Sequence, residues 1–218
     1  MATDEITALR RARRAERLHG IYVIINEDAR APALARAVLE GGVKVLQYRA
    51  KGGLNVGHIQ LLRQFTLAHQ ALLIVNDDWR AALAYNCDGV HLGPDDEGFV
   101  ASASVRAELG DRLIGLSCGT VDEVRFANAQ DVDYVGVGAV YATASKADAG
   151  APIGVDGLRR IAAESWNPVA AIGGIGVAQI DAVRASGVAM AAVIAAVAAA
   201  ADPKAAAQAL VERWNAGA

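Results

Sequence analysis

The sequence has little of what several common classes of protein require. Its 218 residues include only two cysteines, Cys87 and Cys118, which are too few for a disulfide framework and lack the spacing of metal ligands. The four histidines form no HExxH or similar cluster, so each is expected to be structural rather than a metal ligand. A formal net charge of −3 gives no general attraction to nucleic acid or to an anionic membrane.

Long apolar segments are also missing. The first twenty residues contain no apolar core of the kind that a signal peptide needs. The longest apolar run, Val188 to Ala201, is too short and too rich in alanine to span a bilayer. We therefore expect a soluble, cytoplasmic protein whose partners are neither nucleic acid nor membrane.

Five arginines crowd into the segment LRRARRAERL near the N-terminus. Alanines and leucines recur between them at helical spacing, which predicts a helix over about residues 4–18. The favoured interpretation is an amphipathic helix with a solvated basic face. An arm that binds phosphate or RNA is the alternative, but the rest of the chain offers no basic and aromatic surface to support it.

From Gly20 onward, short β-rich runs alternate with helical segments. The β-rich runs are GIYVII, VKVLQYR, ALLIVN, GVHLG, LIGLSC, DYVGVGAVY, NPVAAIGG and VAMAAVI. Eight strand–helix units without a linker predict one α/β domain over residues 1–218, a (β/α)₈ TIM barrel over about 20–215 with an extra N-terminal helix. A doubly wound open sheet is the alternative, but the first strand runs into NEDARAP and lacks the expected G-x-G-x-x-G.

Polar side chains follow the predicted strands where the strands end. LLIVN ends in Asn76 and is followed by Asp77 and Asp78, although an unpaired buried carboxylate is costly. Asp78 is a good N-cap for the next helix, and capping is the simpler explanation for Asp77 as well. The fourth strand is likewise followed by Asp96, in GVHLGPDDEG. Reactive groups of such barrels gather at the C-terminal strand ends, so Asp77 and Asp96 are candidate ligands of Mg²⁺.

Other strand ends carry cationic groups, hydroxyls or glycines. Gln47, Arg49 and Lys51 alternate, so we expect them to point to one side and bind a polyanion; a salt-bridge network at the barrel mouth is the alternative. The seventh strand ends in AIGGIG, and the loops after the last two strands of such barrels often hold a phosphate on backbone amides. The predicted site has one metal, two anionic ligands and no obvious nucleophile, and it would stabilise a departing pyrophosphate.

These motifs, in this order, resemble those of the thiamine-phosphate synthase (thiamine-phosphate pyrophosphorylase) family over nearly all of residues 20–212. QYRAK resembles Q-[FY]-R-x-K, IVNDD resembles I-x-N-D, and VGVGAVYATASK resembles G-x-G-P-[IV]-[FY]-x-T-x-T-K. The resemblance implies a Mg²⁺-dependent transferase in a (β/α)₈ barrel. Such an enzyme joins 4-amino-5-hydroxymethyl-2-methylpyrimidine diphosphate to hydroxyethylthiazole phosphate and releases pyrophosphate. The implied mechanism is dissociative: a pyrimidine-methyl cation forms, and the thiazole nitrogen captures it.

The resemblance also implies roles for individual residues. Mg²⁺ would be held by Asp77 and Asp96. The pyrimidine diphosphate would be bound by Gln47, Arg49, Lys51, Asn76, Ser117 and Lys146. The candidate catalytic residues among them are Arg49, Lys51, Ser117 and Lys146. The thiazole phosphate would contact Thr143, Ser145, Gly174, Ile194 and the backbone of Ala195.

The sequence departs from the family pattern at several positions. Pro94 stands in place of a glutamine, Gly119 in place of a histidine and Ser145 in place of a threonine, while Ala195 lacks the serine hydroxyl that contacts the thiazole phosphate. A barrel similar to the thiazole tautomerases, or a non-catalytic barrel that binds a phosphorylated ligand, is therefore the alternative. Loss of the histidine at Gly119 weighs against a tautomerase. The presence of both metal acids weighs against a binding protein, and homo-oligomer formation is left open.

Overall fold

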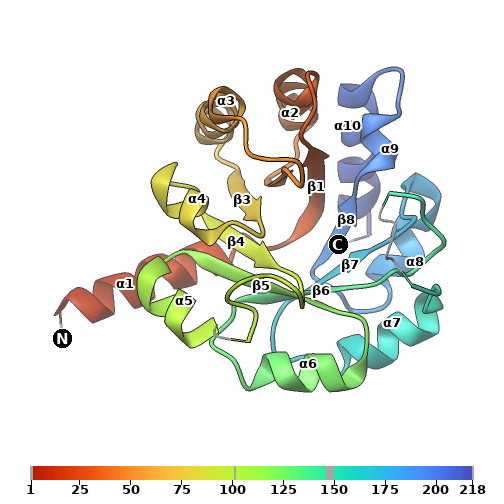
Figure 1. The fold of residues 1–218 in the computed structure, drawn as a ribbon. Helices are drawn as coiled ribbons and strands as arrows, with labels where there is room; N and C mark the ends of the chain where they lie inside the picture. Colours follow the sequence, from red (N-terminus) through yellow and green to blue (C-terminus); the bar gives the residue numbers. More distant parts are fainter. Residues whose placement is uncertain (1, 101, 146–149, 218) are drawn as a thin grey trace.

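The computed structural model describes residues 2–100, 102–145 and 150–217. Eight parallel strands close into a barrel in the order β1 to β8, so the predicted (β/α)₈ fold is confirmed (Figure 1). The strands are β1 (Gly20–Asn26), β2 (Val45–Arg49), β3 (Leu72–Asn76), β4 (Gly89–Leu92), β5 (Leu113–Cys118), β6 (Tyr134–Val137), β7 (Val169–Ile172) and β8 (Met190–Val193).

Helices follow the strands and surround the barrel, as Figure 1 shows. They are α1 (Ala2–Ala15), α2 (Ala31–Glu40), α3 (Val56–Ala68), α4 (Trp79–Ala84), α5 (Ser102–Leu109), α6 (Val121–Asn128), α7 (Gly154–Ala162), the 3₁₀ helix η1 (Val177–Gln179), α8 (Ile180–Arg184), α9 (Ala195–Ala198) and α10 (Pro203–Asn215). Asn55, Asp78, Thr120 and Asp202 accept a backbone hydrogen bond as N-caps, so local chemistry begins these helices where the sequence suggests. No helix within the described ranges is long and apolar enough to cross a membrane.

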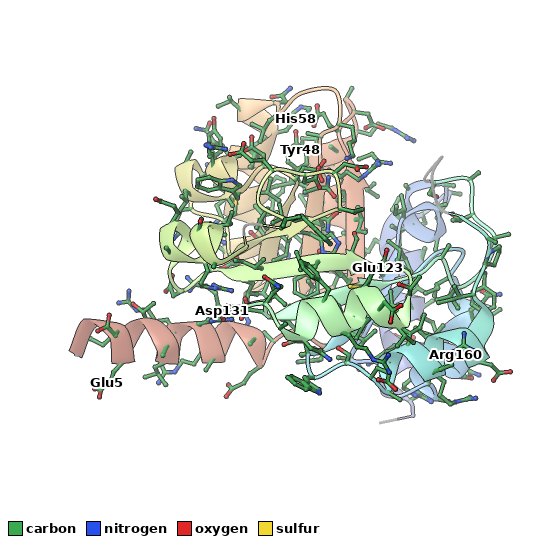
Figure 2. All side chains as sticks on the ribbon, turned by 60° about the horizontal axis from the view of Figure 1, so that its bottom comes forward. Glu5, Tyr48, His58, Glu123, Asp131 and Arg160 are labelled. Carbon is green, nitrogen blue, oxygen red and sulfur yellow. The ribbon has the colours of Figure 1, made fainter. Side chains whose placement is uncertain are left out.

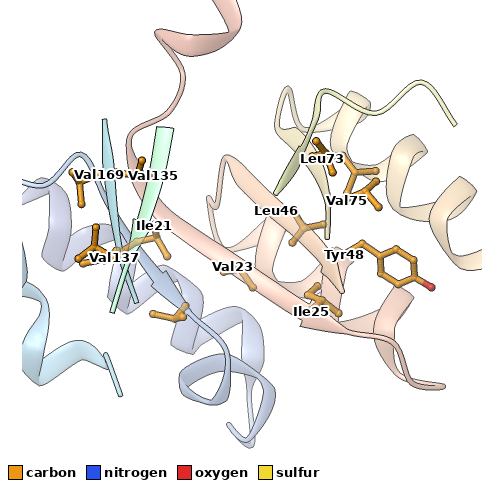
Figure 3. Close-up of a cluster of buried hydrophobic side chains, with 14 of the residues drawn as sticks. Ile21, Val23, Ile25, Leu46, Tyr48, Leu73, Val75, Val135, Val137 and Val169 are labelled. Atoms are coloured by element: carbon orange, nitrogen blue, oxygen red, sulfur yellow. The ribbon is translucent and has the colours of Figure 1, made fainter. Parts of the chain in front are cut away.

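The strands are buried on both faces, which explains their continuous apolar runs. Ile21, Val23 and Ile25 point outward and pack with Leu46, Val75 and Val137 against the helices (Figure 3). The intervening residues Tyr22 and Ile24 point into the barrel, where they form a second cluster with Leu72, Met190 and others. The outward-facing strand residues are thus buried against the helices, and the inward-facing ones are buried against each other inside the barrel.

Helix α1 spans Ala2–Ala15, somewhat earlier than the predicted range of about 4–18. The chain turns after it so that Leu18, which is 3% exposed, enters the interior cluster at the base of the barrel. Figure 2 shows α1 at the end of the molecule opposite Tyr48 and His58, which lie around the C-terminal end of β2. The extra helix therefore lies at the N-terminal end of the strands.

The prediction of a solvated basic face on this helix is wrong for two of its arginines. Arg11 contacts Asp131 at 2.7 Å and Asp133 at 2.6 Å. Arg14 contacts Asp111 at 2.7 Å and reaches Asp88 at 3.4 Å. These acids lie just before the starts of strands. The sequence could not identify them as partners of the arginines, because only the closed barrel brings the strand starts close to α1. The arginines attach α1 to the base of the barrel.

Candidate active site

The C-terminal strand ends surround a cavity of about 920 Å³. Most of the predicted site residues line it: Gln47, Arg49, Asn76, Ser117, Thr143, Ser145, Gly174, Ile194 and Ala195. Lys51, Asp77 and Asp96 lie outside its lining, and Lys146 lies outside the described residues. The nine residues that line the cavity come from six of the eight strand ends or following loops, which parallel strands in a barrel bring to one site.

Strand β2 supplies two side chains to the cavity. Gln47 is 2% exposed and donates from Nε2 to Tyr22 Oη at 2.6 Å. Arg49, two residues further on, donates from Nη1 to Asn26 Oδ1 at 3.0 Å. Lys51 lies in the turn beyond the strand, where alternation no longer sets direction, and its Nζ is 2.7 Å from Asp77 Oδ2. The prediction that all three share one side holds for Gln47 and Arg49, whereas Lys51 forms part of an ion pair at the barrel mouth.

The acids after β3 and β4 meet each other. Asp78 accepts from Ala81 N at 2.9 Å and caps α4, so capping does not explain Asp77. The side chains of Asp77 and Asp96 are hydrogen-bonded to each other, and Asp96 Oδ2 also accepts from Gly93 N at 2.6 Å. Asp77 has a φ of 67°, in the left-handed region, which aspartate and asparagine adopt more readily than most residues other than glycine. The backbone at this member of the carboxyl pair therefore favours a short polar side chain.

The two carboxyls have opposite pKa shifts. Burial raises the pKa of Asp96 to about 6, and its hydrogen bond with Asp77 adds to the rise. Burial also acts to raise the pKa of Asp77, but the hydrogen bonds to Asp96 and Lys51 and the charge of Lys51 outweigh it, so this pKa is lowered. Two carboxyls in contact cannot both ionise easily without a cation. In the described part of the chain, no group of three or more Asp, Glu, His or Cys side chains is placed to hold a metal ion, so a metal at this carboxyl pair would need further oxygens from substrate or water.

Asn76 marks a position where a ligand is expected. Its Nδ2 atom is buried and is one of four such side-chain atoms without a hydrogen-bond partner in the ranges that the structure describes. Its side chain lines the cavity. Leaving a buried donor unpaired costs about 1–3 kcal/mol, and a bound acceptor would recover that cost. The chemistry of this donor fits the predicted diphosphate or pyrimidine ligand.

The opposite wall of the cavity is built from glycines and a helix start. Gly173 and Gly174 have φ values of 107° and 64°. A Cβ on Gly173 would lie 2.6 Å from the Ala139 Cβ, and one on Gly174 would lie 2.6 Å from the Ala142 carbonyl oxygen. Glycine is therefore required here by both conformation and packing. Ala195 begins α9, whose first N–H groups have no partner within the helix, so this wall presents bare backbone amides suited to a phosphate.

Three residues that the sequence did not suggest belong to the cavity or its surroundings: Tyr22 and His91 line the cavity, and Tyr134 lies against them. Tyr22, His91 and Tyr134 point into the barrel and connect Gln47 to Ser117 through hydrogen bonds. In the sequence they stand inside apolar strands, where they read as ordinary core residues. The only local signal was an aromatic hydroxyl or imidazole at an inward position of β1, β4 and β6.

Comparison with known proteins decides the family. A family model described as thiamine monophosphate synthase matches residues 21–197. This chain belongs to the thiamine monophosphate synthase family. The resemblance drawn from the motifs is thereby confirmed, as is the predicted enzyme class, a transferase.

Individual relatives agree with this assignment. The chain is 39% identical to the thiamine-phosphate synthase of Geobacillus kaustophilus over 206 residues, which cover 90% of this chain and 92% of that protein. It is 42% identical over 201 residues to the thiamine biosynthesis bifunctional protein ThiM/ThiE of Symbiobacterium thermophilum; the match covers 90% of this chain and only 41% of that longer protein. Among solved structures, thiamine phosphate pyrophosphorylase from Pyrococcus furiosus superposes with a TM-score of 0.81 at 33% identity, covering 92% of this chain and 97% of that one.

Two departures from the family pattern can now be located. Gly119 lines the cavity, and a Cβ there would make ordinary contacts with Glu123 Oε2 at 3.5 Å and the Gly138 carbonyl oxygen at 3.6 Å. The backbone therefore does not demand glycine, and the missing side chain leaves the wall of this family member more open. Ala195 also lines the cavity, at the start of α9, where a serine hydroxyl would add one donor beside the backbone amides.

Proposed function

We propose that this chain is a Mg²⁺-dependent thiamine-phosphate synthase. It transfers the pyrimidine-methyl group of 4-amino-5-hydroxymethyl-2-methylpyrimidine diphosphate to the ring nitrogen of hydroxyethylthiazole phosphate. The bond between the methylene carbon and the diphosphate oxygen breaks, pyrophosphate leaves with the bonding electrons, and the nitrogen lone pair forms the new C–N bond. The observation that carries the proposal is the pairing of Asp77 with Asp96 and Lys51 at the mouth of a cavity lined by Arg49 and Asn76.

Asp77 and Asp96 are the residues that would hold the cation. Two carboxyls that share a hydrogen bond, one with its pKa raised to about 6, form a donor set that a divalent cation would satisfy. When bound, Mg²⁺ would offset the negative charge that develops on the leaving pyrophosphate. The carboxyl pair is the feature that supports this part of the proposal.

Cationic and amide side chains bind the pyrimidine diphosphate. Arg49 lies on the cavity wall and Lys51 at its edge, where their charges attract the diphosphate and stabilise it as it departs. Asn76 offers its unpaired Nδ2 donor, while Gln47 and Ser117 contact the pyrimidine ring deeper in the barrel. Lys146 is assigned to the same diphosphate from its sequence motif alone.

The thiazole phosphate binds at the glycine-rich wall. Backbone amides around Gly174 and at the start of α9 hold its phosphate, and Thr143 and Ser145 contribute hydroxyls from the β6–α7 loop. Holding both substrates in one cavity places the thiazole nitrogen where it can capture the cation before water does. The cytoplasmic location and the question of a homo-oligomer stay as predicted from the sequence.

A coupled assay tests the proposal. Purified chain is incubated with both substrates, with and without MgCl₂, and both pyrophosphate and thiamine phosphate are measured. We expect equal amounts of the two products, formed only with Mg²⁺ and only when both substrates are present. Binding of either phosphorylated substrate without any product would favour the non-catalytic barrel, and thiazole isomerisation alone would favour a tautomerase.

A further inference from the structure

Five polar side chains form a continuous hydrogen-bonded network across the barrel interior, and four of them line the cavity: Tyr22, Gln47, His91 and Ser117. Gln47 Nε2 donates to Tyr22 Oη at 2.6 Å, and Tyr22 Oη lies 3.0 Å from Tyr134 Oη. Tyr134 Oη lies 3.1 Å from His91 Nδ1, and His91 Nε2 lies 3.0 Å from Ser117 Oγ. The chain begins on β2, passes through β1, β6 and β4, and ends on β5.

Glycines in the barrel strands leave room for this hydrogen-bonded network. Gly115 on β5 pairs in register with His91 on one side and Tyr134 on the other, so the two rings meet above a residue without a side chain. A Cβ on Gly115 would overlap the Tyr134 ring, and one on Gly136 would lie 3.0 Å from His91 Cε1. The imidazole and phenol centroids are 5.4 Å apart. Two glycines thus make room for a polar network in an interior that aliphatic side chains could have filled.

The donors in the chain all point the same way. An amide nitrogen can only donate, so the Tyr22 oxygen accepts from Gln47 and its own hydrogen is directed to Tyr134. Burial raises the pKa of both tyrosines, so each keeps its hydrogen. The Tyr134 hydroxyl then donates to His91 Nδ1, so the imidazole hydrogen lies on Nε2, which donates to Ser117.

We propose that this hydrogen-bonded network is a one-way relay. It holds His91 as the Nε2–H tautomer and leaves the Ser117 hydroxyl free to donate to the pyrimidine ligand. Gln47 is left with its amide oxygen as an acceptor at the other end. The two ends of the relay thus offer one donor and one acceptor to a planar ring that carries both kinds of group. His91 and Tyr134 are positioning residues, because they act on the ligand through Ser117.

The relay gives a role to a residue that the ligand cannot reach. Tyr134 is fully buried and is absent from the cavity lining, whereas Gln47, His91 and Ser117 all line it. Removing one oxygen atom from Tyr134 would free His91 to adopt either tautomer. Ser117 would then lose its fixed donor direction although every atom in contact with the ligand is unchanged.

The first experiment determines the tautomer of His91 in the ligand-free chain by ¹⁵N NMR of the imidazole, at a pH where it is neutral. We expect the Nε2–H form in the wild type and a mixture of tautomers in Tyr134→Phe. A wild-type Nδ1–H form would overturn the relay, because His91 would then donate to Tyr134 and could accept at Nε2 from Ser117. This measurement needs no substrate, so it decides the relay independently of the proposed function.

The second experiment measures binding of the pyrimidine diphosphate and of the thiazole phosphate by calorimetry. Tyr134→Phe should weaken pyrimidine diphosphate binding about tenfold, the size expected for one misdirected hydrogen bond, and leave thiazole phosphate binding within about twofold. His91→Gln places an amide donor near the position of Nε2, so it should keep more of the wild-type affinity for the pyrimidine diphosphate than His91→Leu does. Tyr85→Phe removes a hydroxyl outside the relay and serves as the control.

Unchanged pyrimidine binding in Tyr134→Phe would overturn the positioning role, and equal losses for both ligands would mean a structural role only. The inference about ligand binding rests on the proposed function. If the wild type binds no pyrimidine diphosphate, the proposed function fails, and the NMR result alone then decides whether the relay exists.

Discussion

Replacing Asp77 by two different residues separates the role of its carboxylate from that of its backbone. Asp77 combines an ion pair with Lys51 at 2.7 Å, a hydrogen bond to Asp96 and a φ of 67°. Asparagine keeps the shape of the side chain and tolerates the left-handed region about as well as aspartate. Alanine removes the carboxylate as well, but it adds backbone strain. The two substitutions should therefore differ in stability and agree in activity.

The expected sizes follow from these contacts. Alanine in the left-handed region costs about 1–2 kcal/mol. At about 2–4 °C per kcal/mol for a domain of this size, Asp77→Ala should lower Tm by roughly 2–8 °C. The ion pair with Lys51 is partly exposed, so its loss in Asp77→Asn should cost at most about 1 kcal/mol. Loss of about 3 kcal/mol of charge stabilisation in the transition state corresponds to a rate about 100-fold lower for both variants.

The assay is the initial rate of pyrophosphate release over a range of Mg²⁺ concentrations, with melting curves recorded on the same preparations. Asp78→Asn is the matched control, because it removes the neighbouring charge and keeps the N-cap of α4. We expect wild-type rates in the control and a loss in both Asp77 variants that excess pyrimidine diphosphate does not repair. Wild-type rate and metal dependence in Asp77→Asn would falsify the assignment of Asp77 as a metal ligand.

Three further predictions concern other contacts of the barrel. Lys51→Ala should weaken pyrimidine diphosphate binding about tenfold in calorimetry. It should shift Tm by no more than about 2–4 °C, since the ion pair with Asp77 is partly exposed. A large fall in Tm with normal binding would instead identify a structural salt bridge. Ala195→Ser should lower the KM for thiazole phosphate by one to two orders of magnitude, from about 1.5–3 kcal/mol of charge-assisted hydrogen bonding, and leave the pyrimidine KM unchanged; an unaltered thiazole KM would mean that the backbone amides suffice. Asp133→Ala should lower the free energy of unfolding in urea by about 3–5 kcal/mol, because Asp133 is buried against two arginines. The exposed Asp131→Ala is its control, and equal losses in both would contradict this account.

Much of the fold could be predicted from local features, because each strand and each helix can be recognised from its own segment of the sequence. Strands covered on both faces need continuous apolar runs, and helices need an N-cap at their start, so the eight units could be recognised one at a time. The site residues at the strand ends were predictable for the same reason. In a closed parallel barrel all C-terminal ends meet at one face, so position along each strand was enough to place Gln47, Asn76 and Ser117 in one cavity.

Contacts between distant segments could not be predicted in this way. The partners of Arg11 and Arg14 are acids more than seventy residues away, and neither helix periodicity nor charge counting identifies them. The alternation of side chains along β2 does not predict where Lys51 points, because β2 ends at Arg49 and Lys51 lies in the following turn. Its partner Asp77 directly follows the next strand, and the same fold brings Asp77 to Asp96.

The relay from Gln47 to Ser117 depends most completely on tertiary structure. The apolar runs around Tyr22, His91 and Tyr134 were enough to place all three in strands, where each is compatible with an ordinary core position. The register of β4, β5 and β6 decided that His91 and Tyr134 face each other across Gly115. Alternation along a strand is encoded locally, whereas the level at which inward side chains of different strands meet is set by closure of the whole barrel.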